Sequence, residues 1–117
     1  IISIHAPLNE QTLNLLNLNH LKMIKNNSVL VNVGRGGIIN EKDLLECLSY
    51  KSILVGLDVL ENEPMIDNEI NSKLSKHPNV IITPHIAWAS LEAQKSLIKG
   101  ICLNISDFLN SFSSIGD

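Results

Sequence analysis

Residues 29–37 have the sequence VLVNVGRGG, an apolar run of largely β-branched residues that passes into a glycine-rich turn around one arginine. Three further apolar runs, at residues 1–4, 53–59 and 80–83, also lead into polar or charged side chains. Runs of this length, separated by helix-like stretches, are typical of buried strands in a parallel sheet. They predict an α/β domain with an open, mostly parallel sheet and right-handed crossovers.

The segments between these runs carry helix signals. Residues 11–16, 19–24 and 69–74 predict short helices. Asn40 is a predicted N-cap, with Asp43 at the N3 position, for a helix that places Leu44, Leu45 and Leu48 on one side. Ser90 is the predicted cap of a long last helix, because apolar residues follow it with a period of 3.6; they are Leu97, Ile98, Ile101, Ile105, Phe108, Leu109 and Phe112.

The composition restricts the class of protein. The chain has 117 residues, 44% of them hydrophobic, and a formal net charge of -3, which suits one globular domain. Arg35 is the only arginine and aromatic residues make up 3%, so we expect no nucleic-acid partner. No stretch is apolar enough to span a membrane and no secretion signal is present, so we expect a cytoplasmic protein. Cys47 and Cys102 are expected to be reduced and buried.

Three residues that follow different strands could form a catalytic set, because the carboxyl ends of parallel strands meet at one edge of the sheet. Arg35, flanked by glycines, could grip a carboxylate with its guanidinium; the alternative is a turn arginine in solvent. His85, after Pro84, could move a proton near neutral pH; a lone histidine is more often structural. A carboxylate bound to His85 would favour the imidazolium, and Glu63 and Glu61 are rivals for that place.

Other polar residues give weaker signals. Asp58 ends a buried strand, where it could accept hydrogen bonds from a ligand or cap the following turn. His20 and His77 are expected at the surface and His5 at the rim of a cofactor site. Gly56, inside a strand, suggests the close approach of a neighbouring element. No spacing of histidine, cysteine or carboxylate residues indicates a metal site.

At these residues the chain resembles the D-isomer-specific 2-hydroxyacid dehydrogenases. The resemblance covers nearly the whole chain, in the family's order and spacing. It rests on SIHAPLNEQTLNLLN at 3–17, LKMIKNNSVLVNVGRGGIINEKDLLECL at 21–48, GLDVLENEP at 56–64 and NVIITPHIAWAS at 79–90. Within the family, the LDVLENEP and HIAWAS segments are most similar to the glycerate dehydrogenase (hydroxypyruvate reductase) branch.

The resemblance implies roles for the candidate residues. Arg35 would bind the carboxylate and carbonyl of a 2-oxo acid, His85 would protonate the carbonyl oxygen during reduction, and Glu63 would keep His85 charged. The hydride would come from NAD, with NADP as a possibility. The positions that match the family's cofactor contacts are His5, Ala6, Pro7, Thr12, Val33, Gly34, Arg35, Asp58, His85, Ala87 and Trp88.

Some features of a complete family member do not occur in this sequence. The GxGxxG turn is absent, as is the acidic residue that selects NAD over NADP. We therefore expect residues 1–117 to be the second half of a Rossmann-like, doubly wound NAD(P)-binding domain, with an α/β part at 1–89 and a terminal helix at 90–112. The GxGxxG half and the substrate domain would precede Ile1, the full protein would be a homodimer, and the isolated segment would be inactive.

Two functions from different classes follow from the resemblance. The first is an oxidoreductase acting on a small 2-oxo or 2-hydroxy acid such as hydroxypyruvate, glycerate or glyoxylate, with 3-phosphoglycerate as the substrate variant. The second is a dinucleotide-sensing interaction protein of the same fold, similar to the C-terminal-binding corepressors, which share the tryptophan seen at Trp88. The low-GC composition and short loops favour the enzyme over the interaction protein. A third possibility, a degenerate chain with only structural value, is disfavoured because Arg35, Glu63 and His85 are all intact.

Overall fold

The computed structural model describes residues 1–63 and 68–113, with side chains up to residue 111. Pro64 and the side chain of Phe112, both used in the sequence interpretation, lie outside the described residues. The chain divides into two units, Ile1–Ile86 and Ala87–Asp117. The first unit contains strands β1 (Ile2–Ile4), β2 (Val29–Asn32), β3 (Leu54–Leu57) and β4 (Val80–Ile82), and helices α1 (Leu18–Met23), α2 (Glu41–Leu48) and α3 (Glu69–Ser75).

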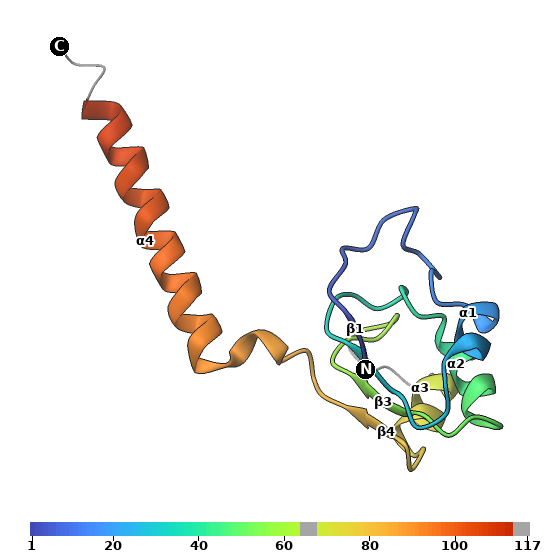
Figure 1. Ribbon diagram of the computed structural model, residues 1–117. Coiled ribbons are helices and arrows are strands. Elements are labelled where there is room, and N and C mark those ends of the chain that lie inside the picture. The colour runs from blue at the N-terminus through green and yellow to red at the C-terminus, as the bar shows by residue number, and fades with distance from the viewer. Residues whose placement is uncertain (64–67, 114–117) are drawn as a thin grey trace. The chain divides into compact units, whose positions relative to one another are not determined.

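The four strands form one parallel sheet in chain order, β1-β2-β3-β4, which confirms the predicted architecture (Figure 1). Ile4, Asn32, Leu57 and Ile82 stand opposite one another in register. The segments that follow these four positions therefore leave the sheet along one edge, where the candidate residues were expected. The strands are shorter than their apolar runs, since β3 covers only part of residues 53–59.

Helices α1, α2 and α3 lie side by side against one face of the sheet (Figure 1). Each helix connects neighbouring strands, so right-handed crossovers place all of them on the same face. The Asn40 side chain accepts a hydrogen bond from the Asp43 N–H at 2.9 Å, which confirms the predicted cap of α2. The core between helices and sheet is built from buried apolar residues, among them Leu21, Leu30, Ile38, Leu44, Ile53, Val55, Leu57 and Leu74.

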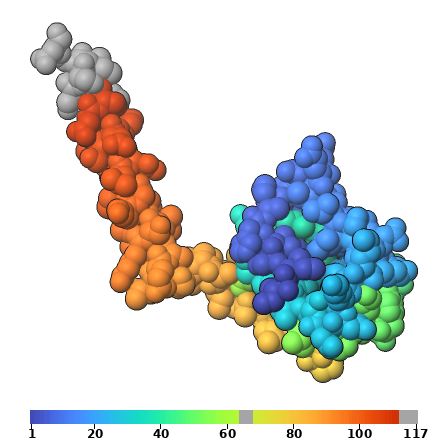
Figure 2. Space-filling view, viewed as in Figure 1, coloured from blue at the N-terminus to red at the C-terminus, as the bar shows by residue number. Residues whose placement is uncertain are grey.

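The helix predicted over residues 11–16 does not form. The Asn9 side chain accepts hydrogen bonds from the N–H groups of Gln11 and Thr12, which begins a turn instead. Asn14 then has φ 52°, a left-handed conformation that a right-handed helix cannot include. Leu16 ends the segment in a bridge to Ile39. This surface segment, blue in Figure 2, is therefore a set of local turns.

The sequence also predicts features of three individual residues of this unit, Gly56, His77 and Cys47. A Cβ at Gly56 would lie 3.8 Å from Val31, an ordinary contact, so the predicted close approach at this glycine is wrong. His77 is half-buried and its Nδ1 accepts from the Asn79 N–H at 3.2 Å, so it is not a simple surface histidine. Cys47 is buried and free, as expected.

The second unit contains a 3-10 helix, η1 (Ala87–Ala89), and the long helix α4 (Leu91–Ser113). The Ser90 hydroxyl accepts from the Ala93 N–H at 3.1 Å, which confirms the predicted cap. Cys102 is exposed on α4, contrary to the expectation that both cysteines are buried. The apolar row of α4 is also exposed, at 61% for Phe108 and 62% for Ile98. Figure 2 shows α4 as a single rod of side chains. Within the described residues, no helix is both long and apolar enough to cross a membrane.

Candidate active site

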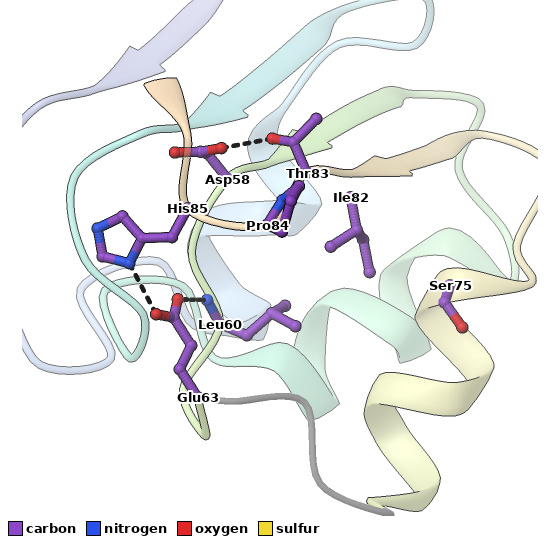
Figure 3. A pocket seen from close by; sticks show the side chains of 8 residues that line it. All are labelled: Asp58, Leu60, Glu63, Ser75, Ile82, Thr83, Pro84 and His85. Atoms are coloured by element: carbon purple, nitrogen blue, oxygen red, sulfur yellow. Dashed lines mark hydrogen bonds and ion pairs between the residues drawn. The ribbon is translucent and has the colours of Figure 1, made fainter. Parts of the chain in front are cut away.

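His85 and Glu63 form the centre of the candidate site. His85 follows the end of β4, and Glu63 lies in the segment after the neighbouring strand β3. Nδ1 of His85 lies 2.7 Å from Oε2 of Glu63, and the two side chains point toward each other in Figure 3. Glu61, the rival carboxylate, contributes its backbone N–H to Glu41 instead. Of the two rival acids, Glu63 is therefore the one that pairs with His85.

The charge of Glu63 is stabilised by two hydrogen bonds. Partial burial opposes ionisation, but the hydrogen bond with His85 and a second one from the Leu60 N–H outweigh it, so the pKa of Glu63 lies below its ordinary value. The Leu60 N–H donates to Oε1 at 2.7 Å. One carboxylate oxygen is thus tied to the backbone and the other to the imidazole. This arrangement fixes both the charge and the orientation of Glu63.

The turn that carries His85 has an unusual backbone conformation. His85 has φ 55°, in the left-handed region that few non-glycine residues adopt. Its N–H donates to the carbonyl oxygen of Asp58 at 3.0 Å. Oδ1 of the buried Asp58 accepts from the Thr83 hydroxyl at 2.5 Å and from the Ile86 N–H at 2.9 Å. Asp58 therefore holds the segment that follows β4, and its expected cofactor contact stays a prediction.

Arg35 lies at the end of the neighbouring strand β2. Its Nη1 donates to the Gly34 carbonyl at 2.8 Å, and its side chain is exposed. Asn32, a buried residue at the end of β2, holds this turn: its Nδ2 donates to the Arg35 carbonyl at 2.9 Å and its Oδ1 accepts from the Gly34 N–H at 3.0 Å. The Asp58 N–H also donates to the Asn32 carbonyl at 2.9 Å. The turns after β2 and β3 are thus linked.

A pocket of about 720 Å³ opens beside the His85–Glu63 pair (Figure 3). Its volume is in the range of small-molecule sites. Apolar side chains and convergent polar groups both line it: Asp58, Leu60, Glu63, Ser75, Ile82, Thr83, Pro84 and His85. Among the described residues, this lining includes two members of the predicted catalytic set but not Arg35.

The predicted cofactor residues after β1 form a separate part of the same sheet edge. The Thr12 hydroxyl donates to the Pro7 carbonyl at 2.7 Å, which closes the surface turn. His5 is exposed, with Nε2 2.8 Å from the Ser3 hydroxyl. Ala6 contacts the turn after β2 closely, since a Cβ at Gly34 would lie 2.9 Å from the Ala6 carbonyl oxygen. The Val33 N–H donates to the Ile4 carbonyl at 3.3 Å, which continues the pairing of β1 with β2.

Ala87 and Trp88, also predicted to contact the cofactor, belong to the second unit. Both lie in η1, and Trp88 is 60% exposed. Within the described residues, no three histidine, cysteine, aspartate or glutamate side chains gather where they could hold a metal ion.

Sequence interpretation missed Asn32 and Glu41, two buried polar residues beside the site. Asn32 was detectable as the polar residue inside an otherwise apolar strand, VLVNV. Glu41 is 5% exposed at the first position of α2, where a carboxylate is ordinary because it favours the helix dipole. Nothing in the sequence distinguishes it from a solvent-exposed helix residue. Its contact with Glu61 depends on the three-dimensional arrangement.

Comparison with known proteins is consistent with this geometry. Residues 1–87 match the family described as "D-isomer specific 2-hydroxyacid dehydrogenase, NAD binding domain". A glycerate dehydrogenase from Methylorubrum extorquens is 37% identical over 110 residues, which cover 93% of this chain and 35% of the relative. A hydroxypyruvate reductase from Thermotoga maritima is 43% identical over 95 residues, which cover 80% of this chain and 31% of the relative.

A solved structure supports the same relationship. The crystal structure of D-lactate dehydrogenase with NAD+ from Lactobacillus jensenii has a TM-score of 0.73 and 30% identity, and the match covers 84% of this chain and 33% of that one. The chain therefore spans about a third of the length of the relatives it matches, as the 35% and 31% shares show.

Proposed function

This chain belongs to the D-isomer specific 2-hydroxyacid dehydrogenases, and on that premise we propose that the protein transfers hydride between a nicotinamide cofactor and a small 2-oxo or 2-hydroxy acid. The observation that carries the proposal is the contact between Nδ1 of His85 and Oε2 of Glu63 at 2.7 Å. This contact pairs an imidazole, which can carry a proton, with a carboxylate. Both side chains line the pocket, and they come from the segments that follow the neighbouring parallel strands β3 and β4. Reduction of a carbonyl by hydride needs such a proton source.

The proton is assigned to His85. With Nδ1 directed at the ionised Glu63, the imidazole ring has a fixed orientation, and Nε2 is the atom assigned to the substrate. During reduction Nε2 gives its proton to the carbonyl oxygen, and during oxidation it takes the proton back from the hydroxyl. Glu63 compensates the positive charge of the imidazolium while it exists. General acid–base catalysis of this kind is worth about 10²- to 10⁴-fold in rate.

The substrate's carboxylate is assigned to Arg35. A guanidinium donates two parallel hydrogen bonds to a carboxylate, which orients the acid as well as binding it. The buried side-chain amide of Asn32 hydrogen-bonds the Gly34 N–H and the Arg35 carbonyl. The backbone that carries the Arg35 side chain therefore has a defined position. Such positioning lowers the entropy cost of bringing the substrate's carbonyl to His85.

The residues around the pocket fit a nicotinamide group. Leu60, Ile82 and Pro84 offer apolar surface for a flat ring, while buried Asp58 and the His85 turn supply polar groups at the same opening. Asp58 is assigned to the carboxamide end, and the remaining contacts of this unit to the turns after β1 and β2. Ala87 and Trp88 are separate candidates for a cofactor contact. Bound there, the cofactor would supply the hydride.

The substrate class is proposed from the relatives, among them a glycerate dehydrogenase and a hydroxypyruvate reductase. We assign hydroxypyruvate, glycerate or glyoxylate as the substrate, 3-phosphoglycerate as the variant, NAD as the first choice of cofactor and a homodimer as the assembly. Because the chain covers 35% of the glycerate dehydrogenase, we expect the isolated 117 residues to bind NAD weakly and to turn over nothing.

The test is a spectrophotometric screen of the full-length protein. Oxidation of NADH and of NADPH is followed with glyoxylate, hydroxypyruvate, pyruvate and phosphohydroxypyruvate. We expect turnover with at least one of these acids and with NADH preferred. Absence of turnover with all four acids and both cofactors, in a protein shown to be folded, would contradict the proposal. Hydroxypyruvate reduction by the isolated chain would contradict the expected need for the rest of the protein.

A further inference from the structure

The turn that presents Glu63 to His85 is held against the segment after β2. The Leu60 carbonyl packs against Gly36 so closely that a Cβ there would lie 1.9 Å from the carbonyl oxygen and 2.5 Å from the Glu61 nitrogen. Only a hydrogen atom fits at this position. The start of the turn therefore rests directly on the backbone of residue 36.

Glu41 holds the same turn from a second side. It is the first residue of α2 and is 5% exposed. Its Oε1 accepts the Glu61 N–H at 2.5 Å. Burial raises the pKa of Glu41, and the neighbouring charges of Glu61 and Glu63 raise it further, although the Glu61 hydrogen bond lowers it. A carboxylate buried at such a cost needs a compensating contact, and among the described residues the backbone N–H of Glu61 provides one.

Two consecutive amides of this turn connect Glu41 to the candidate pair. The Glu61 N–H donates to Glu41, and the preceding N–H, that of Leu60, donates to Glu63 at 2.7 Å. Glu63 in turn lies 2.7 Å from His85. The two peptide units are joined at the Cα of Leu60, so a displacement of the Glu61 amide also displaces the donor that orients Glu63 unless the backbone torsions of Leu60 absorb it.

We propose that Glu41 is a positioning residue: through the backbone of Glu61 it sets the place and the charge of Glu63, and so the pairing of Glu63 with His85. The proposal rests on the proposed function only in taking that pair as the acid–base group. Glu41 touches no reacting atom in this scheme. Its contribution is to keep the turn where both hydrogen bonds of Glu63 form.

The contact of Glu41 with the turn does not depend on its charge. A carboxyl oxygen accepts a hydrogen bond from an N–H in either protonation state, and so does the amide oxygen of glutamine. Methionine has a similar length and suits a buried site, but its sulfur is a weak acceptor. Glu41→Gln should therefore keep the turn in place, whereas Glu41→Met should release it.

The experiment is an NMR titration of the full-length protein and its two variants, labelled with ¹³C at the glutamate carboxyl. In the parent and in Glu41→Gln, we expect the Glu63 carboxyl to titrate below the ordinary 4.5. In Glu41→Met we expect its pKa to rise toward that value, because the two hydrogen bonds loosen. Amide exchange at Glu61 should speed up about tenfold in Glu41→Met, which corresponds to the loss of one hydrogen bond. An unchanged Glu63 pKa in folded Glu41→Met would overturn the proposal.

A second measurement covers the case in which Glu41→Met does not fold. In Glu61→Gln, which removes the carboxylate of residue 61 itself, the amide proton of residue 61 should titrate with the same midpoint as the Glu41 carboxyl. Absence of that shared midpoint would show that the contact does not exist and overturn the proposal. Both measurements use no substrate. If the titrations behave as expected but the full-length protein reduces none of the 2-oxo acids, the proposed function is refuted and the role of Glu41 is not.

Discussion

Oε2 of Glu63 lies 2.7 Å from Nδ1 of His85, although the two residues are separated by 22 positions in the chain. The contact follows from the topology, since β3 and β4 are parallel neighbours whose carboxyl ends share one edge. Different hydrogen bonds then hold each of the two residues in place. Glu63 is oriented by the Leu60 amide, and His85 by the hydrogen bonds of its turn to Asp58.

Replacement of the imidazole tests proton transfer. We expect His85→Gln in the full-length protein to lose about 10²- to 10⁴-fold in kcat, because a glutamine amide cannot give a proton to the substrate's carbonyl oxygen or take it back from the hydroxyl. Cofactor affinity, measured by quenching of protein fluorescence, should stay close to that of the parent. His20→Gln is the matched control, since His20 is exposed on α1. Turnover as fast as the parent's would refute the role given to His85.

Separate replacement of Glu61 and Glu63 by glutamine tests which of the two carboxylates acts on His85. Glu63→Gln should lower kcat, because the amide keeps a hydrogen bond but cannot compensate the imidazolium charge. Glu61→Gln should leave kcat close to the parent value, since residue 61 contributes its backbone N–H to the site. Steady-state kinetics of the two full-length variants decide between them, and a larger loss in Glu61→Gln would contradict the assignment.

The pH dependence of stability should have opposite signs at Glu63 and Glu41. The folded-state pKa of Glu63 is lowered, so its ionisation stabilises the fold above the ordinary 4.5, and this stabilisation is lost as pH falls through the folded pKa. Burial raises the pKa of Glu41, so its ionisation destabilises the fold as pH rises from the ordinary 4.5 through the folded pKa. At neutral pH, urea unfolding should find Glu63→Gln less stable and Glu41→Gln more stable than the parent. Both differences should shrink in acid; the same sign for both variants at neutral pH would be inconsistent with these shifts.

The Asn32 side chain should be needed for the turn that carries Arg35. Asn32→Leu has similar volume but leaves the buried Gly34 N–H without its acceptor, so we expect a loss of about 1–3 kcal/mol in the free energy of unfolding. In the full-length protein the same change should raise KM for the 2-oxo acid. The Arg35 carbonyl loses its hydrogen bond from the Asn32 Nδ2, so the turn that positions Arg35 is held less firmly. Asn32→Asp keeps the acceptor for Gly34 and should recover part of the stability. Equal losses in both variants would argue against the hydrogen bonds as the cause.

Gly36 and Gly56 serve as test and control for the packing of the turn that carries Glu63. Gly36→Ala places a Cβ 1.9 Å from the Leu60 carbonyl oxygen, so the turn must shift, and we expect a loss of about 1–3 kcal/mol. Gly56→Ala meets only Val31 at 3.8 Å and should be tolerated. Chemical denaturation of both variants is the measurement, and equal stabilities would mean that the backbone contact at Gly36 has no energetic weight.

The sequence predicted the sheet well because its strands are short β-branched runs and because helical connections force them to be parallel. It predicted the α2 and α4 caps for a similar reason: Asn40 and Ser90 act on amides within three residues. The helix at 11–16 failed because the left-handed Asn14 interrupts an otherwise helix-compatible segment. Spacing alone left Glu61 and Glu63 as rivals, and only the family resemblance pointed to Glu63. The burial of Glu41 could not be predicted, since it depends on how the turn after β3 packs against α2.

The left-handed backbone at His85 also limits how this position can change during evolution. Side chains differ in how readily they adopt such a conformation: asparagine, aspartate and glycine do so easily, whereas valine, isoleucine and threonine resist it. A lineage that abandoned the chemistry could drift to the first group with little damage to folding. Replacement by a β-branched residue would cost the scaffold as well, so the substitutions found in inactive descendants should be small, polar and unbranched.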